Sequence, residues 1–297
     1  MKKRNWIFFV IVHVIFLGIW GALIEIPEKN GFPATLGYVI WAITMIPAAI
    51  VALKVNKWKL DWNKKSMLLG FTIGLLGSVG QLVLLITLRT APAYLVFPLL
   101  SLTPVVTIFL AVIFLKERTG KFGWYGIGIA LIAILMLSYQ PNGDMSVSGY
   151  MWMVLTAIPL LTWGAQGFVM RFANESMNAE SIFFYMMISS VVLIPVAIYM
   201  TNFSEPINWG FNGLYLAGLV HILNAFGVLF LVYAFRYGKA IIIAPITTAL
   251  SPVLTVILSL AIYGLIPHPI IIIGMLLALT AAFLMGFEET NKEIENK

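Results

Sequence analysis

The sequence predicts an all-α, polytopic integral membrane protein with ten transmembrane helices. Three observations support this prediction: the composition, a series of long apolar runs, and basic residues confined to alternate loops. Of the 297 residues, 61% are hydrophobic and 10% are charged, against about 25% charged in a typical soluble domain. Twelve acidic and 18 basic residues cannot cover a soluble protein of this size. The composition therefore excludes a soluble enzyme, a DNA-binding domain and a disordered protein.

Ten apolar runs have about the 20 residues that a helix needs to cross a bilayer. Backbone polar groups in lipid must be hydrogen-bonded within their own segment, so such runs favour helices. They lack the alternation of apolar and polar residues that is typical of a transmembrane β-strand. In chain order the runs are Trp6–Ile26, Leu36–Leu53, Met67–Leu88, Ala93–Leu115, Phe122–Tyr139, Tyr150–Met170, Ile182–Met200, Leu214–Phe235, Ala240–Ile266 and Pro269–Phe287.

The ends of the runs fix the expected topology. Lys2, Lys3 and Arg4 precede the first run as in a signal peptide, but no small-residue cleavage site follows, so we expect a retained helix. With the N-terminus inside, 16 of the 18 basic residues fall in inner segments, and the outer loops contain only Lys29 and Arg89. This bias predicts that both termini are cytoplasmic. For a transporter of this kind we expect the inner (plasma) membrane.

Two halves of the chain carry the same motifs in the same order. Thr103-Pro-Val-Val-Thr107 in the fourth run matches Ser251-Pro-Val-Leu-Thr255 in the ninth, and Trp20-Gly21 matches Trp163-Gly164. We therefore divide the chain into a first repeat (1–145), a second repeat (146–290) and a polar tail (291–297). Because five helices are an odd number, the two repeats have opposite orientations in the membrane, an architecture found in many secondary transporters.

These features resemble the drug/metabolite transporter superfamily in its EamA-type branch. The resemblance rests on ten helices, the two Trp-Gly pairs, and a proline-rich fourth helix that closes in Phe114-Leu-Lys-Glu-Arg118. It implies secondary transport of a small organic solute, with export of amino acids or related metabolites favoured. The sequence departs from the family pattern at Gly264-Leu265, where the second half lacks an acid like Glu117. The arginine that is common in the second helix of the family is also absent.

Few polar side chains lie deep in the predicted helices, so these are the candidates for binding a solute. His221 and Asn224 share one face of the eighth helix, and their repeat partners, Gly74 and Gly77, form a small-residue face on the third. The hypothesis is a central cavity; the alternative is hydrogen bonding between helices without a substrate. The candidate residues are His13, Trp20, Gln81, Trp163, Gln166, His221, Asn224 and, with less support, Tyr94 and Tyr233.

Two further hypotheses concern mechanism. Pro98, Pro104, Pro245 and Pro252 remove backbone hydrogen bonds, so they are candidate hinges for alternating access, or else they produce static curvature. Histidine changes charge near neutral pH, so His13 or His221 is a candidate for proton coupling; the alternative is a neutral, hydrogen-bonded ring.

The sequence lacks the motifs of several other classes of protein. No pair of membrane aspartates, no His-Glu-x-x-His, no Gly-x-Ser-x-Gly and no phosphate-binding loop occurs in the chain. There are no cysteines, which excludes disulfides and cysteine-ligated metals. We expect no cofactor, no metal, no nucleic acid and no enzymatic activity, and a monomer or weak homodimer. Import of a sugar, nucleoside or vitamin, a channel or scramblase, and a His-dependent intramembrane acyltransferase remain alternatives.

Overall fold

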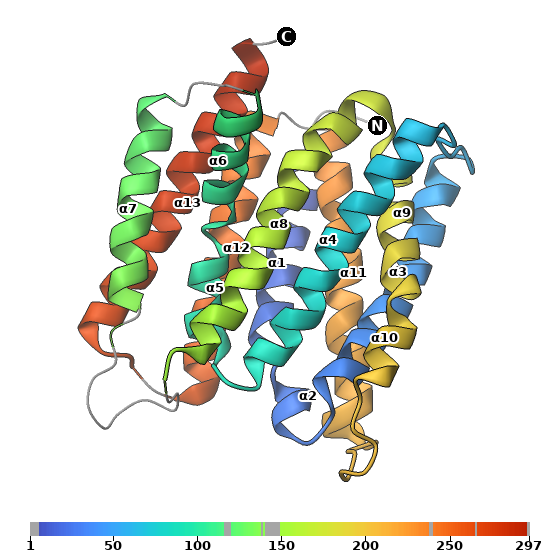
Figure 1. Cartoon of the computed structure of the whole chain (residues 1–297), viewed down its shortest axis with the longest axis vertical. Coiled ribbons are helices and arrows are strands. Elements are labelled where there is room, and N and C mark those ends of the chain that lie inside the picture. Colours follow the sequence, from blue (N-terminus) through green and yellow to red (C-terminus); the bar gives the residue numbers. More distant parts are fainter. Residues whose placement is uncertain are drawn as a thin grey trace.

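The computed structural model describes residues 6–115, 120–137, 139, 149–237, 240–264 and 266–295, and every regular element in these ranges is a helix. Most of the helices stand side by side in one bundle (Figure 1). The elements are α1 (Trp6–Leu23), α2 (Ile26–Lys29), α3 (Ala34–Val55), α4 (Lys64–Leu88), α5 (Ala93–Leu100), α6 (Thr103–Leu115), α7 (Lys121–Leu137), α8 (Met151–Ser176), α9 (Ala179–Val192), α10 (Ile194–Tyr199), the π-helical turn η1 (Phe211–Tyr215), α11 (Leu216–Tyr237), α12 (Ala240–Tyr263) and α13 (Pro269–Glu295).

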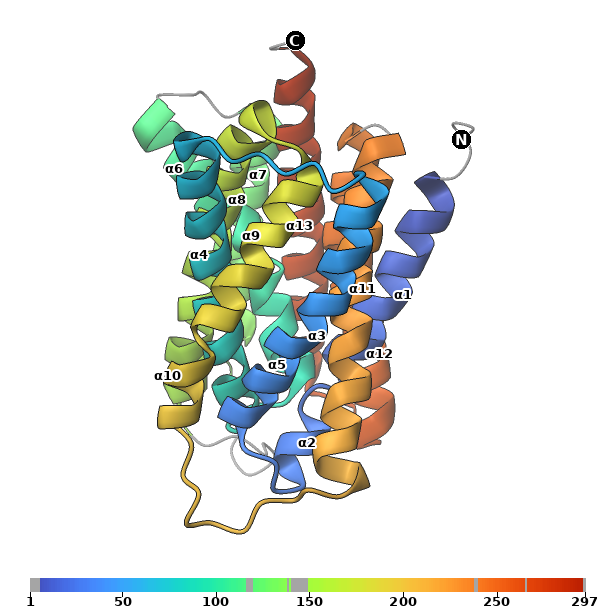
Figure 2. The ribbon, with the colours of Figure 1, turned by 90° about the vertical axis from the view of Figure 1, so that its right-hand side faces the viewer.

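The first helix of each half packs against the other half. Helix α1 lies mainly against α11 and α12, whereas α8 lies mainly against α4 and α6. Helices α1 and α8 run in opposite directions through the bundle (Figure 1). The beginning of α1 and the end of α13 lie at one end of the bundle, and α2 lies at the other, which we call the α2 end (Figure 2). Each half therefore packs its first helix into the other half, an arrangement that we call exchanged packing.

Three predicted helices are interrupted where proline occurs. The run predicted as Ala93–Leu115 is two helices, α5 and α6, because Pro104 in the first turn of α6 cannot donate a backbone hydrogen bond. The Ser101 hydroxyl donates to the Pro98 carbonyl at 2.7 Å, and the Thr103 hydroxyl donates to the Leu100 carbonyl. These side chains satisfy carbonyls that the break leaves open.

Two other interruptions shorten or divide predicted helices. The first helix ends at Leu23 rather than Ile26, because Pro27 lies in the first turn of the separate short helix α2, which begins at Ile26. The seventh predicted helix begins three residues earlier than expected and divides at Leu193, before Pro195. In contrast, α12 continues without a break through Pro245 and Pro252. The proline motif therefore interrupts the helix in the first half, whereas the helix continues through it in the second half.

The lengths of the elements bear on the membrane. Within the described residues, seven helices are long and apolar enough to span a bilayer, and three shorter apolar segments lie in α7, α12 and α13. The eighth predicted helix begins with a π-helical turn, and α13 runs to Glu295, so most of the predicted polar tail is helical. The chain is a polytopic membrane protein; the number of ten spans and the cytoplasmic termini stay predictions.

Candidate functional site

A central cavity lies between the two halves and consists of two lobes that share Leu17, Trp20 and Trp163. The α5–α12 lobe has a volume of about 300 Å³ and the α4–α11 lobe about 200 Å³. The α5–α12 lobe is further lined by His13, Phe97, Leu100, Ser101, Thr103, Thr247, Ser251, Pro252 and Thr255. The α4–α11 lobe is further lined by Trp41, Gly74, Gly77, Ser78, Gln81, Gln166, Met186, Asn224 and Val228.

Three tryptophans line the α4–α11 lobe, and each indole N–H donates to a neighbouring helix. Trp41 Nε1 donates to Asn224 Oδ1 at 2.9 Å. Trp163 Nε1 donates to the Gly77 carbonyl at 3.2 Å, and Trp20 Nε1 donates to His221 Nδ1 at 3.4 Å. These bonds satisfy the indole N–H groups, so the three rings line the cavity without an open donor. An aromatic face can stack on a planar or cationic group.

The two deep histidines have different hydrogen-bonding roles. His13 Nδ1 lies 2.9 Å from the Gly227 carbonyl; because a carbonyl can only accept, Nδ1 of His13 carries the hydrogen. His221 Nδ1 accepts from Trp20, so in neutral His221 the hydrogen lies on Nε2. Both rings are buried, but His13 lines the α5–α12 lobe whereas His221 stands behind Trp20. His221 therefore positions an indole.

Three amide side chains lie around the α4–α11 lobe. Gln166 Nε2 donates to the Ile73 carbonyl at 3.0 Å, and Asn224 accepts from Trp41. Gln81 is 3% exposed, and its Nε2 has no hydrogen-bond partner. A buried amide donor without a partner is costly in a low-dielectric interior. Gln81 thus supplies an open hydrogen-bond donor in the wall of the cavity.

The glycine face of α4 makes room for side chains of α8 and α9. A Cβ at Gly77 would lie 2.4 Å from Gln166 Nε2, and a Cβ at Gly80 would lie 2.4 Å from Trp163 Nε1. At Gly74 the Ser189 hydroxyl would be only 2.3 Å away. The predicted small-residue face is therefore the surface on which polar side chains from the second half reach the backbone of the first.

The two sequence motifs that repeat along the chain contact each other across the halves. The Thr107 hydroxyl donates to the Gly164 carbonyl at 2.9 Å, and the Thr255 hydroxyl donates to the Gly18 carbonyl at 3.3 Å. A Cβ at Gly21 would lie 2.5 Å from Thr255 Oγ1. Glycine is thus required where the Trp-Gly helix of one half crosses the Pro-Val-x-Thr helix of the other.

Some predicted residues lie away from both lobes. Tyr94 packs edge-to-face on Tyr263 at 5.7 Å, and Tyr233 packs on Phe9. Of the four prolines, Pro252 lines the cavity, Pro98 is buried in α5, Pro104 opens α6, and Pro245 lies in α12. Glu117, noted above for the family pattern, lies outside the described residues.

Sequence reasoning missed two features of this region. Trp41 was not a candidate, although a tryptophan inside a predicted span, rather than in the membrane interface where this residue is enriched, was a usable signal. Glu25, at the outer end of the predicted first helix, and Glu28 were not candidates either. Their side chains are 1% and 8% exposed, so they are buried carboxylates. Their burial depends on α2 folding back over the bundle, which the sequence did not reveal.

The arrangement is suited to binding a neutral or zwitterionic molecule. Among the residues that line the two lobes, His13 has the one side chain that can carry a charge. In the described part of the chain, no three His, Cys, Asp or Glu side chains gather as a metal site would require. The walls offer indole faces, hydroxyls and amides, which together recognise shape and hydrogen-bonding pattern rather than net charge.

Comparison with known proteins places this geometry in context. The model of the EamA-like transporter family matches residues 4–139 and 148–287. The chain is similar to Protein LicB of Haemophilus influenzae, with 22% identity over 221 residues, 71% of this chain and 74% of that protein. A solved crystal structure aligns with a TM-score of 0.61 and 15% identity over 95% of this chain and 96% of that one, which shows a shared fold.

Proposed function

This chain belongs to the EamA-like transporter family, and we propose that it is a secondary transporter that works by alternating access through the central cavity. Its family makes it a multi-pass membrane protein of the plasma membrane that transports small solutes. The finer proposal concerns the solute, the direction of transport and the mechanism. The resemblance to metabolite carriers favours export of an amino acid or a related metabolite.

Alternating access is supported by the exchanged packing of the halves. Helices α1 and α8 each cross into the opposite half and line the cavity through Trp20 and Trp163. A change in the angle between the halves would therefore move both tryptophans relative to the lobes. Two five-helix repeats of opposite orientation, 1–145 and 146–290, are the arrangement in which such a change exchanges the open and closed ends.

The open donor of Gln81 is the observation that carries the binding proposal. Gln81 lines the α4–α11 lobe together with three tryptophans and Asn224. A solute with a carbonyl or carboxylate oxygen would satisfy this donor, and its apolar or planar part would lie on the tryptophans. Because no acidic side chain lines either lobe, a zwitterionic or uncharged molecule fits better than a strongly cationic one.

The first test is a thermal-shift screen of the purified protein with neutral amino acids, nucleosides, sugars and quaternary ammonium compounds. We expect a neutral amino acid or related zwitterion to raise the melting temperature. The variant Gln81→Ala should lose at least half of that shift, whereas Thr72→Ala on the exposed face of the same helix should keep it. Stabilisation by quaternary ammonium compounds alone would overturn the substrate proposal.

Counterflow in proteoliposomes separates a carrier from a channel. Vesicles loaded with the unlabelled stabilising solute should transiently accumulate the labelled form above its external concentration. A channel or scramblase equilibrates the label without this overshoot. Absence of an overshoot with every stabilising solute would therefore contradict transport by alternating access.

A further inference from the structure

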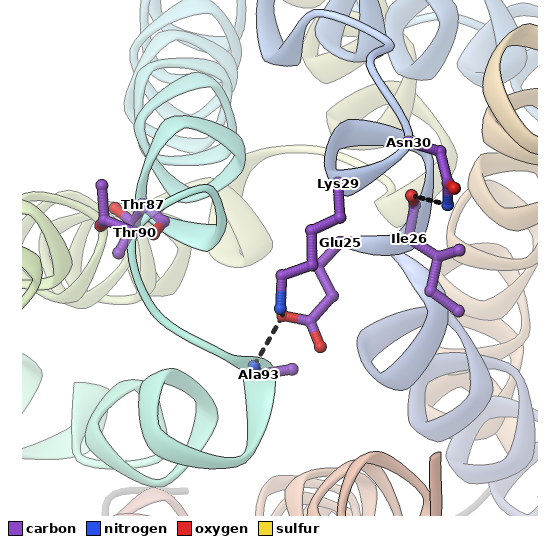
Figure 3. Close-up of polar contacts among 7 residues, drawn as sticks. All are labelled: Glu25, Ile26, Lys29, Asn30, Thr87, Thr90 and Ala93. Atoms are coloured by element: carbon purple, nitrogen blue, oxygen red, sulfur yellow. Dashed lines mark hydrogen bonds and ion pairs between the residues drawn. The ribbon is translucent and has the colours of Figure 1, made fainter. Parts of the chain in front are cut away.

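At the α2 end of the bundle, the buried carboxylate of Glu25, which pairs with the partly exposed Lys29, fastens α2 to the beginning of α5. Glu25 Oε2 accepts from the backbone N–H of Ala93 at 3.0 Å and lies 3.2 Å from Lys29 Nζ. Figure 3 shows Lys29 and Ala93 converging on the Glu25 carboxylate from these two elements. Lys29 Nζ also lies 4.4 Å from the centre of the Tyr263 ring at the end of α12. We call this set of contacts the Glu25 clasp.

Glu28 stands next to the clasp and has a different environment. Its side chain is 8% exposed, and neither carboxylate oxygen has a hydrogen-bond partner. The carboxylate faces the first turn of α3: a Cβ built at Gly37 would lie 3.9 Å from Glu28 Oε1. A carboxylate that is buried without hydrogen bonds is strongly destabilised in its ionised form. The site therefore requires a bound cation, and a proton is the smallest.

The charged groups around Glu28 are few. Arg89, which follows α4, together with Glu25 and Lys29, acts on it electrostatically. On α3 the nearest titratable residue is Tyr38, whose hydroxyl donates to the Ser190 carbonyl instead; η1, which also packs on α2, contributes only the exposed Tyr215. In the described part of the chain no group of three possible metal ligands occurs. A proton therefore fits this site better than a metal ion.

We propose that Glu28 is the site at which the transporter binds and releases a coupling proton, and that the Glu25 clasp is the gate that this proton controls. The proposal rests on the proposed function. When Glu28 is neutral, Lys29 is paired with Glu25, and the clasp holds α2 against α5. When the proton leaves, the new carboxylate competes with Glu25 for Lys29 and repels it, so the clasp weakens. The exposed turn after Lys29 gives the proton a short path to the solvent.

The first experiment follows the clasp without any solute. The chain contains no cysteine, so the double variant Asn30→Cys/Thr90→Cys places a unique pair of spin labels at two exposed positions on either side of the gate. We expect the distance distribution measured by pulsed electron paramagnetic resonance to change between acidic and alkaline pH. The change should vanish with E28Q and persist with E205Q, which alters an exposed acid at the same end.

Infrared spectroscopy supplies an independent readout of the proton itself. The carbonyl band of a protonated carboxylic acid should titrate with pH in the wild type, be lost in E28Q and remain in H13Q. Size-exclusion chromatography identifies variants that do not fold. If E28Q does not fold, E28D takes its place and should retain a titrating band with a displaced midpoint. A distance that does not respond to pH, or a band and a distance change that survive in E28Q, would overturn the proposal.

The outcome is separable from that of the proposed function. A protein that shows solute counterflow but no pH response that depends on Glu28 would retain the transport proposal and lose the coupling site. A protein that shows the pH response without counterflow would lose the transport proposal, and the assignment of Glu28 as a proton site would stand. Retention of the band in E28Q would assign it to another carboxylic acid and remove Glu28 as the proton site.

Discussion

Helices α4 and α11 occupy equivalent places in the two halves, yet the cavity uses them differently. On α4 the face is formed by Gly74, Gly77 and Gly80, and polar side chains of the second half bond to backbone carbonyls. On α11 the equivalent face carries His221 and Asn224, and tryptophans of the first half bond to these side chains. One half is recognised through its backbone, and the other through its side chains.

The difference shows how a repeated fold can form an asymmetric binding site. The exchanged packing is common to both halves, because each pairs a Trp-Gly helix with a Pro-Val-x-Thr helix of the other. The chemistry is not common, because glycine offers only its backbone whereas histidine and asparagine add donors and acceptors of their own. The proline motif also behaves differently in the two halves: it interrupts the helix between α5 and α6 and leaves α12 continuous.

The largest expected effect comes from filling the glycine face. Gly77→Leu would force its side chain into Gln166, because even a Cβ would lie 2.4 Å from that amide. Overpacking of this kind costs about 3 kcal/mol, so we expect a strongly lowered melting temperature and no solute binding. Gly128→Leu is the matched control, since nothing lies within 4 Å of its Cβ. Equal stability of the two variants would show that α4 does not depend on backbone contact.

Removal of a hydrogen-bonding side chain on α11 should lower the stability less than filling the glycine face of α4. Asn224→Ala leaves the buried Trp41 indole N–H without its acceptor, which costs about 2 kcal/mol. Trp41→Phe in the same background removes the stranded donor, so the double variant should be more stable than the sum of the single effects by about 1 kcal/mol. Thermal melting of the four proteins measures this coupling; strict additivity would argue against the bond.

The two equivalent tryptophans provide a direct comparison between the halves. Trp20→Phe removes the donor to His221 Nδ1 and leaves a buried acceptor unpaired, at a cost of about 1 kcal/mol. Trp163→Phe leaves only the Gly77 carbonyl, which lies within α4 and can bond along its own helix, so we expect about half that cost. Melting curves should rank Trp20→Phe as the less stable variant. The reverse order would contradict the contrast between backbone and side-chain recognition.

Small effects of similar size are expected where the halves are alike. Thr107→Val and Thr255→Val each remove one hydroxyl that donates to a carbonyl of the opposite half. Hydrogen bonds between membrane helices are worth about 0.6 kcal/mol on average, so both variants should lose little stability. Thr280→Val, whose hydroxyl bonds only within its own helix, is the control. A large loss in one threonine variant alone would show that the halves differ here as well.

Much of the fold was predictable because a bilayer imposes simple rules on sequence. Long apolar runs located the helices, and the recurrence of Trp-Gly and Pro-Val-x-Thr revealed the two halves. Helix boundaries were less accurate at Pro27, Pro104 and Pro195, since proline interrupts a helix only where neighbouring groups satisfy the freed carbonyls. Pro252 shows the opposite outcome within a similar local sequence.

Most residues of the candidate site were also predictable, because polar and aromatic side chains are rare deep in such a chain. His13, Trp20, Gln81, Trp163, Gln166 and Asn224 all line the cavity. Sequence reasoning also included Tyr94 and Tyr233 as weaker candidates, and their rings pack elsewhere. It also passed over Trp41, since the direction in which a side chain points depends on the rotation of its helix rather than on its depth in the membrane.

The sequence by itself determined the membrane class, the all-helical fold and the repetition of motifs, because hydrophobicity and order along the chain are local properties. Only the tertiary structure decided which helices exchange between the halves, which partner each indole N–H takes, and that Glu25 and Glu28 are buried. These depend on contacts between residues far apart in the sequence, such as Trp20 with His221, which are separated by 201 positions. The few charged residues were therefore informative in two ways. The positions of the basic residues along the chain predicted the topology, and the burial of two acidic residues at α2 was visible only in the structure.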